Sequence, residues 1–157
     1  MAMILIAALA KNRVIGSGQG MPWSVPEEYA QYLAFIEGQT VIMGRRSWEI
    51  FGGDLTSRHA LVVSRSNLTL DGAEVCGSLE RAIDRGRELG GRLFCAGGAG
   101  IYAQAMPLAS EMYLSFIRGD FEGDAYFPEI DASKWEIERE VDHSAFRFVA
   151  YRRVDRA

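Results

Sequence analysis

Short, continuous runs of apolar residues recur through the first two thirds of the chain, and they constrain the fold more than any other feature. They cover residues 4–9, 40–44, 60–64 and 93–96, with a shorter strand-like segment at 74–76. A strand that is apolar at every position is typical of a parallel sheet with helices on both faces. Between the runs lie helical patterns, over residues 25–37, 46–51 and 78–89 and from 99 to about 106. This order of strand, loop, helix and strand predicts an α/β fold with a largely parallel sheet.

The last third of the chain changes character. Its strand-like segments cover residues 111–118, 135–141 and 146–154. In the second of these, one side of the strand carries Trp135, Ile137, Arg139 and Val141, and acidic residues occupy the other. His143-Ser-Ala is suited to a turn between the last two segments. We therefore expect an antiparallel pair at one edge of the sheet.

Length and charge narrow the class of protein. A chain of 157 residues predicts a single domain, residues 1–157, that buries most of its apolar surface. The net charge of −4 argues against binding to nucleic acid or to a membrane surface as the main role. Arginine outnumbers lysine by 15 to 2, so the positive charge that exists suits bidentate contacts with phosphate or carboxylate.

Cysteine, histidine and the first apolar run bear on location and metals. Cys76 and Cys95 lie in apolar runs without a paired spacing, which predicts buried thiols in a reducing compartment. The run at residues 3–10 lacks the basic flank of a signal peptide, so a buried first strand and a cytoplasmic protein are expected. His59 and His143 have no metal-ligand companions in the sequence and are expected at the surface, so no metal site is predicted.

The helix expected to begin near Val25 carries an unusual carboxylate. Ser24-x-x-Glu27 has the spacing of a capping box. At 3.6 residues per turn Glu28 falls on the apolar face, whereas Glu27 and Gln31 point elsewhere; the same face carries Val25, Tyr32 and Phe35. A buried carboxylate without a partner is costly, so an inward Glu28 implies a function. A slightly rotated helix would leave Glu28 at the rim, and the helix alone favours neither reading.

Three predicted strands end in residues that suit phosphate. The segments are Gly44-Arg45-Arg46-Ser47, Ser64-Arg65 and Gly97-Gly98-Ala99-Gly100. Ligands of open α/β sheets gather at the carboxyl ends of the strands, and the last segment opens a helix, whose free N–H groups favour anions. Each arginine alone is most simply a solvated loop residue, and the glycines do not form G-x-G-x-x-G. Together they favour a polyphosphate ligand, and the two basic loops favour NADP over NAD.

The ordered set of motifs resembles the dihydrofolate reductase family over nearly the full chain. It comprises Met21-Pro22-Trp23, a carboxylate at position 28, Val41-Ile42-Met43-Gly44-Arg45, Gly97-Gly98-x-x-Ile101-Tyr102 and Glu122-Gly123-Asp124-x-x-Phe127-Pro128. The resemblance implies a three-layer fold with an eight-stranded, mostly parallel sheet, an antiparallel C-terminal edge and about four helices. It also implies the cofactor NADPH, the small-molecule substrate dihydrofolate and a monomeric enzyme.

The resemblance also implies which residues form the site. Catalytic roles fall to Glu28, Trp23, Met21 and Ser115. Dihydrofolate contacts fall to Ile6, Ala7, Ala8, Glu28, Tyr29, Tyr32, Phe51, Leu55, Arg58, Tyr102 and Ser115. Contacts with NADPH fall to Ala8, Ile15, Gly16, Gly44, Arg45, Arg46, Ser47, Val63, Ser64, Arg65, Gly97, Gly98, Ala99, Gly100, Ile101, Tyr102 and Gln104.

Within this set the resemblance implies distinct roles. Glu28, supported by Ser115, would hold the amidine edge of the pterin, and Arg58 would hold the carboxylate of the glutamate tail. Residues 16–23 would form a lid, in which Met21 shields the nicotinamide and Trp23 holds a water molecule. Hydride would pass from the nicotinamide to the pterin imine, and water would deliver the proton.

The sequence departs from common family patterns at several positions. Glu28 replaces the aspartate that is more usual in bacterial members. Tyr29 and Tyr32 stand where leucine and phenylalanine are commoner, and Ala96 stands where a larger residue is usual. Two alternatives therefore stay open: the related reductase of riboflavin synthesis, and a nucleotide-binding module without turnover. Loss of NADPH absorbance with and without dihydrofolate would separate the three.

Overall fold

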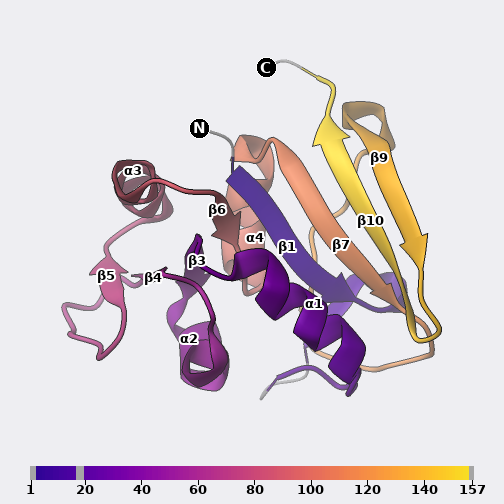
Figure 1. Ribbon diagram of the computed structural model, residues 1–157, viewed down its shortest axis with the longest axis horizontal. Helices are drawn as coiled ribbons and strands as arrows, with labels where there is room; N and C mark the ends of the chain where they lie inside the picture. Colours follow the sequence, from indigo (N-terminus) through magenta and orange to yellow (C-terminus); the bar gives the residue numbers. More distant parts are fainter. Residues whose placement is uncertain (1–2, 17–19, 156–157) are drawn as a thin grey trace.

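The computed structural model describes residues 3–16 and 20–155, and its centre is an eight-stranded sheet (Figure 1). The strand order is β5-β4-β3-β6-β1-β7-β10-β9. The bounds are β1 Met3–Leu9, β3 Thr40–Gly44, β4 His59–Val63, β5 Glu74–Cys76, β6 Leu93–Cys95, β7 Glu111–Ile117, β9 Trp135–Asp142 and β10 Phe146–Arg153. The pairs from β5 to β7 are parallel, and β10 pairs antiparallel with β7 and β9. The predicted fold class and its antiparallel edge are confirmed.

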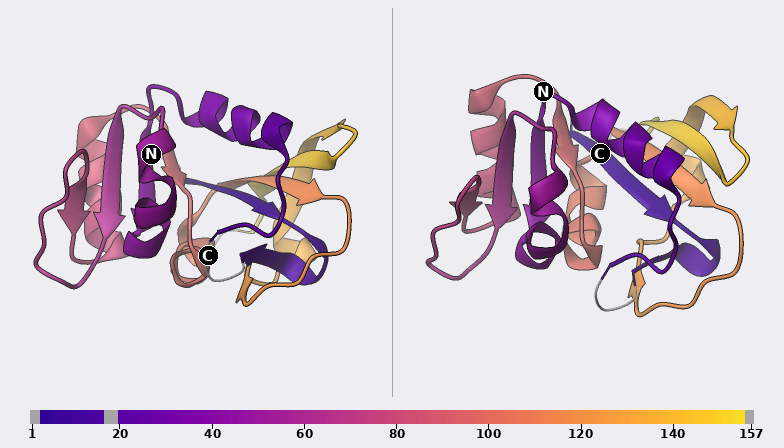
Figure 2. Two further views of the ribbon diagram at one scale, coloured as in Figure 1. Left: turned by 90° about the horizontal axis from the view of Figure 1, so that it is seen from below. Right: turned by 60° about the horizontal axis from the view of Figure 1, so that its bottom comes forward.

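Four α-helices cover the two faces of the sheet (Figures 1 and 2). They are α1 Pro26–Ile36, α2 Arg45–Phe51, α3 Leu79–Leu89 and α4 Ala99–Ala105. Apolar residues of α1 and α2 pack against Ile4, Val41 and Val62 on one face. Residues of α3 and α4 pack against the opposite face, together with Leu5 and Ile42. Neighbouring strand residues therefore face different helix layers, which explains why the runs are apolar at every position.

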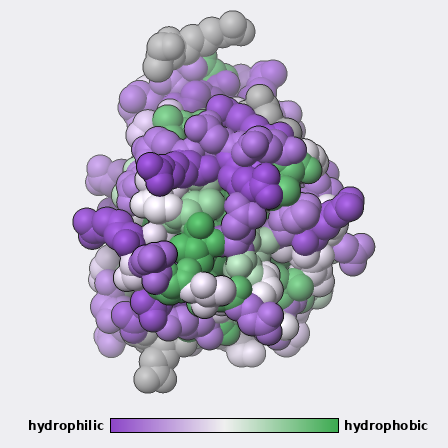
Figure 3. Space-filling model, turned by 90° about the vertical axis from the view of Figure 1, so that its left-hand side faces the viewer, coloured by the Kyte–Doolittle hydropathy of each residue, from purple (hydrophilic) through white to green (hydrophobic). Residues whose placement is uncertain are grey.

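Short elements complete the chain. A second sheet pairs β2 Val14–Gly16 with β8 Ala125–Tyr126. Single 3-10 turns lie at Lys11–Arg13, Gly52–Asp54, Met106–Leu108 and Ala132–Lys134. None of the helices within residues 3–16 and 20–155 has both the length and the apolar character needed to cross a membrane. On the face drawn in Figure 3, hydrophobic residues gather near the centre and hydrophilic residues surround them.

One expectation about local structure is wrong, and one strand is less covered than its neighbours. The capping box does not form, because the N-cap residue of α1 is Val25 and not Ser24, and the valine side chain has no hydrogen-bond acceptor. The apolar side of β9 is only partly buried: Trp135 is buried, but Ile137 and Val141 are 50% and 40% exposed. The reason is that β9 is the outermost strand of the sheet, and few residues cover its inward-facing side chains.

The cysteines and histidines fit their predictions to different degrees. Cys76 and Cys95 are buried free thiols, as predicted. No group of potential metal ligands occurs among the described residues. His143 is more than a solvated residue, because its Nδ1 lies 3.0 Å from Oε1 of Glu27 and its ring stacks on Phe146 at 4.3 Å. This contact ties the start of α1 to the β9–β10 hairpin.

Candidate active site

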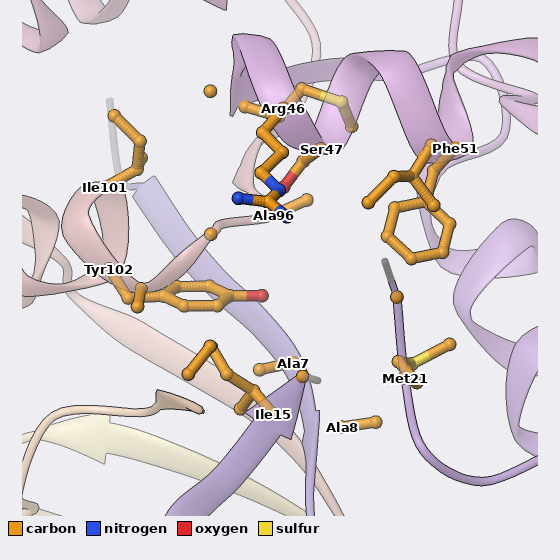
Figure 4. A pocket seen from close by; sticks show the side chains of 18 of the residues that line it. Ala7, Ala8, Ile15, Met21, Arg46, Ser47, Phe51, Ala96, Ile101 and Tyr102 are labelled. Atoms are coloured by element: carbon orange, nitrogen blue, oxygen red, sulfur yellow. The ribbon is translucent and has the colours of Figure 1, made fainter. Parts of the chain in front are cut away.

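A cavity of about 580 Å³ opens at the carboxyl ends of the central strands, between α1, α2 and α4. This is the edge at which open α/β sheets bind ligands. Figure 4 shows Arg46 and Ser47 entering it from α2, Tyr102 from α4, and Met21 and Phe51 on the far side. Most predicted site residues line it: Ile6, Ala7, Ala8, Ile15, Gly16, Met21, Glu28, Tyr29, Tyr32, Gly44, Arg45, Arg46, Ser47, Phe51, Gly98, Ala99, Gly100, Ile101, Tyr102 and Gln104.

Other predicted residues lie around this cavity rather than in its wall. Trp23 lines an adjoining cavity of about 370 Å³, which shares Met21, Glu28 and Tyr29 with the first. Ser115 is buried behind Glu28 on β7. The remaining predicted residues, outside both walls, are Leu55, Arg58, Val63, Ser64, Arg65 and Gly97. Residues 17–19 of the predicted lid lie outside the described residues.

The sequence did not identify several wall residues. These are Met43, Ile50, Asp124 and Ala125; Gly20 belongs to the predicted lid, and Ala96 was noted as a departure from the family pattern. Asp124 and Ala125 reach the cavity because β8 pairs with β2, which follows β1. The pairing involves so few residues that no periodicity marks it in the sequence.

Glu28 is the buried acid of the cavity. Glu28 is 6% exposed, so the helix has the rotation that turns this residue inward, and not the alternative that leaves it at the rim. Burial raises the pKa of Glu28 to about 7, and a hydrogen bond with the Ser115 side chain partly opposes that rise. At neutral pH both protonation states of this carboxyl group are therefore populated. A group with such a pKa can exchange protons near physiological pH.

The expectation that Gln31 points away from the site is wrong. Its Nε2 donates to Oγ of Ser115 at 3.3 Å. Gln31 lies one turn after Glu28, and residues three apart share one side of a helix. The half-buried Gln31 thus reaches β7 beside the buried carboxylate.

Aromatic side chains form the wall next to Glu28. The ring of Tyr29 lies 5.9 Å from that of Tyr32 and 6.5 Å from that of Phe51, measured between centroids. The Tyr29 hydroxyl donates to Oδ2 of Asp54 at 2.8 Å, which links α1 to the turn after α2. Burial is the largest cause of the raised pKa of Tyr29, and Asp54 adds to it, so this hydroxyl stays protonated at neutral pH.

Tyr102 and Trp23 supply further polar atoms. The Tyr102 hydroxyl donates to the carbonyl oxygen of Ile6 at 2.6 Å and fixes α4 against β1. Trp23 packs edge-on against Phe121 at 5.5 Å. Its buried Nε1 finds no acceptor among the described residues. A buried donor of this kind is matched to a bound polar group or water.

Glycines shape the other end of the cavity. The backbone N–H of Gly44 donates to the Gly97 carbonyl at 2.8 Å, which joins β3 to the loop after β6. A Cβ on Gly97, whose φ is +94°, would lie 2.7 Å from the Tyr102 ring. A Cβ on Gly98 would reach 3.5 Å from Oγ of Ser47. The absence of side chains here leaves backbone close to Ser47 and Arg46, an arrangement suited to a phosphate-bearing ligand.

An α/β sheet with a phosphate-suited loop and a buried carboxyl group in one cavity is typical of enzymes that act on a small molecule with a nucleotide cofactor. Comparison with known proteins identifies the family within that class. The sequence profile of the family described as dihydrofolate reductase matches residues 2–153. The chain belongs to the dihydrofolate reductase family. The match favours the first of the three readings drawn from the sequence.

Individual relatives agree. The chain is 41% identical to a dihydrofolate reductase of Neisseria gonorrhoeae over 152 residues, which cover 94% of this chain and 92% of that protein. It is 38% identical to dihydrofolate reductase type A13 of Escherichia coli over 134 residues, or 85% and 81% of the two chains. Among solved structures, dihydrofolate reductase from Enterococcus faecalis complexed with NADP(H) and RAB-propyl superposes with a TM-score of 0.89 at 26% identity, covering 98% and 97% of the chains.

Proposed function

We infer that the protein reduces 7,8-dihydrofolate to 5,6,7,8-tetrahydrofolate with NADPH, which supplies a hydride to the pterin imine. The observation that carries this inference is the buried Glu28 in the wall of a cavity whose opposite end is lined by Gly44, Gly98 and Ser47. The family membership and the similarity to a reductase complexed with NADP(H) support it. NADPH is accordingly the cofactor and a folate the small-molecule substrate.

The residues present fit the cofactor. We propose that NADPH contacts the predicted residues from Ala8 and Ile15 to Gln104, with its phosphates at the glycine loop and at Arg45, Arg46 and Arg65. The glycine loop supports this assignment, because Gly98 lines the cavity without a side chain and a Cβ on it would lie 3.5 Å from Oγ of Ser47. Arg65 follows β4, which neighbours β3, and it is exposed, so its side chain is accessible to the added phosphate of NADPH.

We propose that Glu28 binds the amidine edge of the pterin and biases the ring toward protonation. A carboxylate can accept both amidine N–H bonds, and the low polarity of the site strengthens this contact. The remaining proposed substrate contacts come from the aromatic wall and from Arg58 at the glutamate tail. Trp23, with its unmatched indole donor, would hold the water that passes the proton, and Met21 would shield the reacting rings.

The decisive assay follows NADPH absorbance with and without dihydrofolate. Dihydrofolate-dependent oxidation is expected; its absence, with NADPH still bound, would leave a binding module. Glu28→Gln should lower turnover at neutral pH by roughly 10²–10⁴, the usual range for a positioned acid or base, while NADPH affinity stays unchanged. The loss should shrink at low pH, where solvent protonates dihydrofolate. Normal turnover of the variant at neutral pH would remove Glu28 from the mechanism.

We propose further that the enzyme acts as a monomeric single domain in the cytoplasm. The continuous sheet supports a single domain, and the buried free thiols of Cys76 and Cys95 support a reducing compartment. Light scattering of the purified chain tests the oligomeric state. A mass of two chains would contradict the proposal.

A further inference from the structure

A chain of polar side chains leads from the half-buried surface of α1 to the buried carboxyl group. Gln31 Nε2 donates to Ser115 Oγ at 3.3 Å, and the Ser115 side chain is hydrogen-bonded to Glu28. Ser115 is 2% exposed and lies inside β7, where it pairs with Ala8 of β1 and Phe148 of β10. Strands therefore flank Ser115 on both sides, which fixes its backbone opposite α1.

Donor and acceptor chemistry gives this series of hydrogen bonds, from Gln31 through Ser115 to Glu28, a direction. The ionised Glu28 carboxylate only accepts hydrogen bonds, whereas the Gln31 amide nitrogen only donates them. The Ser115 hydroxyl has a single hydrogen. When Gln31 donates to its oxygen, that hydrogen is left for Glu28. The reverse orientation of the Gln31 amide would draw the hydrogen away and leave the carboxylate without its donor.

Other groups around Glu28 do not provide this stabilisation. Tyr29 and Tyr32 on α1 and Tyr102 on α4 are the titratable groups coupled to it, and each has a raised pKa that keeps it neutral at pH 7. The carboxylate of Asp54 faces Tyr29 rather than Glu28. No nearby cation contributes to the pKa of Glu28 within residues 3–16 and 20–155. The Ser115 hydroxyl is therefore the group in the described chain that favours the ionised form.

We propose that Gln31 is a positioning residue for the reduction: it orients the Ser115 hydroxyl toward Glu28 and thereby sets how readily Glu28 holds a proton. The inference rests on the proposed function for its catalytic consequence. Its physical core, the coupling from Gln31 to Glu28 through Ser115, exists in the free protein and is measurable without substrate.

The direct test is a titration of the Glu28 side-chain carboxyl carbon by NMR in the full chain without substrate. Gln31→Leu nearly keeps the side-chain volume and removes the donor that orients Ser115, so the pKa of Glu28 should rise by up to about 0.5–1 pH unit, the equivalent of one hydrogen bond. Gln31→Glu should raise it further, because the new carboxylate accepts the Ser115 hydrogen and adds a like charge. The matched control is Ala34→Gln, at an exposed position one turn farther along the same helix from Glu28, which should leave the titration unchanged.

A double-mutant cycle with Ser115→Ala separates positioning from altered burial. In that background Gln31→Leu should produce no further change in the pKa of Glu28. A rise of the same size without Ser115 would mean that the introduced leucine side chain acts by excluding water. An unchanged titration in the single variant would mean that Gln31 does not act at all. Either result overturns the proposal.

The pH profile of hydride transfer provides the second readout. Hydride transfer requires a proton held between Glu28 and the bound pterin. The descending limb of the Gln31→Leu profile should therefore move to higher pH by about the same 0.5–1 unit, with its low-pH plateau unchanged. A plateau that falls without a displaced limb would indicate general damage and contradict positioning. An inactive parent protein that still shows the NMR effect would refute the proposed function but not the coupling.

Discussion

Replacing Glu28 with glutamine should stabilise the protein at pH 8 and leave its stability nearly unchanged at pH 4. The reason is the burial of this carboxyl group, which raises its pKa in the folded chain from 4.5 to about 7. Below pH 4.5 the carboxyl group is neutral in both the folded and the unfolded chain. Between pH 4.5 and 7 the unfolded chain ionises first, so the free energy of unfolding falls as the pH rises.

The size of the effect follows from the same difference in the pKa of Glu28 between the folded and the unfolded chain. Each unit of difference in pKa corresponds to about 1.4 kcal/mol, so the rise from 4.5 to about 7 lowers stability by about 3 kcal/mol once the pH exceeds 7. Glutamine is neutral at every pH, so it does not contribute this fall in the free energy of unfolding with rising pH. At pH 4 the variant and the unmodified chain should differ by less than about 1 kcal/mol, because both side chains are then neutral hydrogen-bonding groups of similar shape.

Urea unfolding of both chains at pH 4, 6 and 8 measures this difference, because all other titrating groups are common to both. Glu37→Gln provides the control: Glu37 is exposed at the end of α1, and its replacement should give a curve parallel to the unmodified chain. The expected result is a gap between the Glu28→Gln and unmodified curves that widens by about 3 kcal/mol from pH 4 to pH 8. Parallel curves would show that Glu28 is as well solvated in the folded as in the unfolded chain.

Three further predictions concern other residues of the site. Arg46→Ala combined with Arg65→Ala should erase most of the preference for NADPH over NADH, since each contact with a charged phosphate contributes about 1.5–3 kcal/mol; unchanged Kd ratios would place the phosphate elsewhere. Arg58→Leu should raise KM for dihydrofolate on the order of 10–100-fold, but not for a pterin without the glutamate tail; equal losses would indicate a structural arginine. Tyr29→Phe should lower the free energy of unfolding in urea by about 0.5–1.5 kcal/mol through loss of the Asp54 contact, and Asp54→Ala, which removes the acceptor, should abolish that difference.

The central sheet was predictable because burial on both faces makes each strand a continuous apolar run. Such runs located β1, β3, β4 and β6 to within one or two residues. The β2–β8 pairing escaped prediction because its strands have three and two residues, too few for any periodicity. In β9 the alternation correctly indicated an edge strand, but it did not show that Ile137 and Val141 on its apolar side stay partly exposed.

The features of the site likewise divide into those that a local sequence pattern predicts and those that it does not. Helical spacing brought Glu28 onto the apolar face, which local periodicity can do, and the structure resolved its rotation. The contact of Gln31 with Ser115 depends on which β7 residue lies opposite α1, and the two are 84 positions apart in the chain. No local pattern encodes that register. The link between Tyr29 and Asp54 was hidden for the same reason, although an extra hydroxyl in an apolar wall indicated that a partner was needed.

The distribution of burial along α1 explains how the protein tolerates an ionisable group in its wall. The C-terminal half of the helix is anchored: Ile36 is 0% exposed, and Phe35 lies 5.0 Å from Tyr113 and 5.3 Å from Phe148 between ring centroids. Burying such side chains stabilises the fold by about 1.5–3 kcal/mol each, which offsets the destabilisation of about 3 kcal/mol at Glu28. The N-terminal half is consequently free to border the cavity. A helix anchored at one end can thus keep a carboxyl group desolvated, which is the condition that moves its pKa to the range where it can exchange protons at neutral pH.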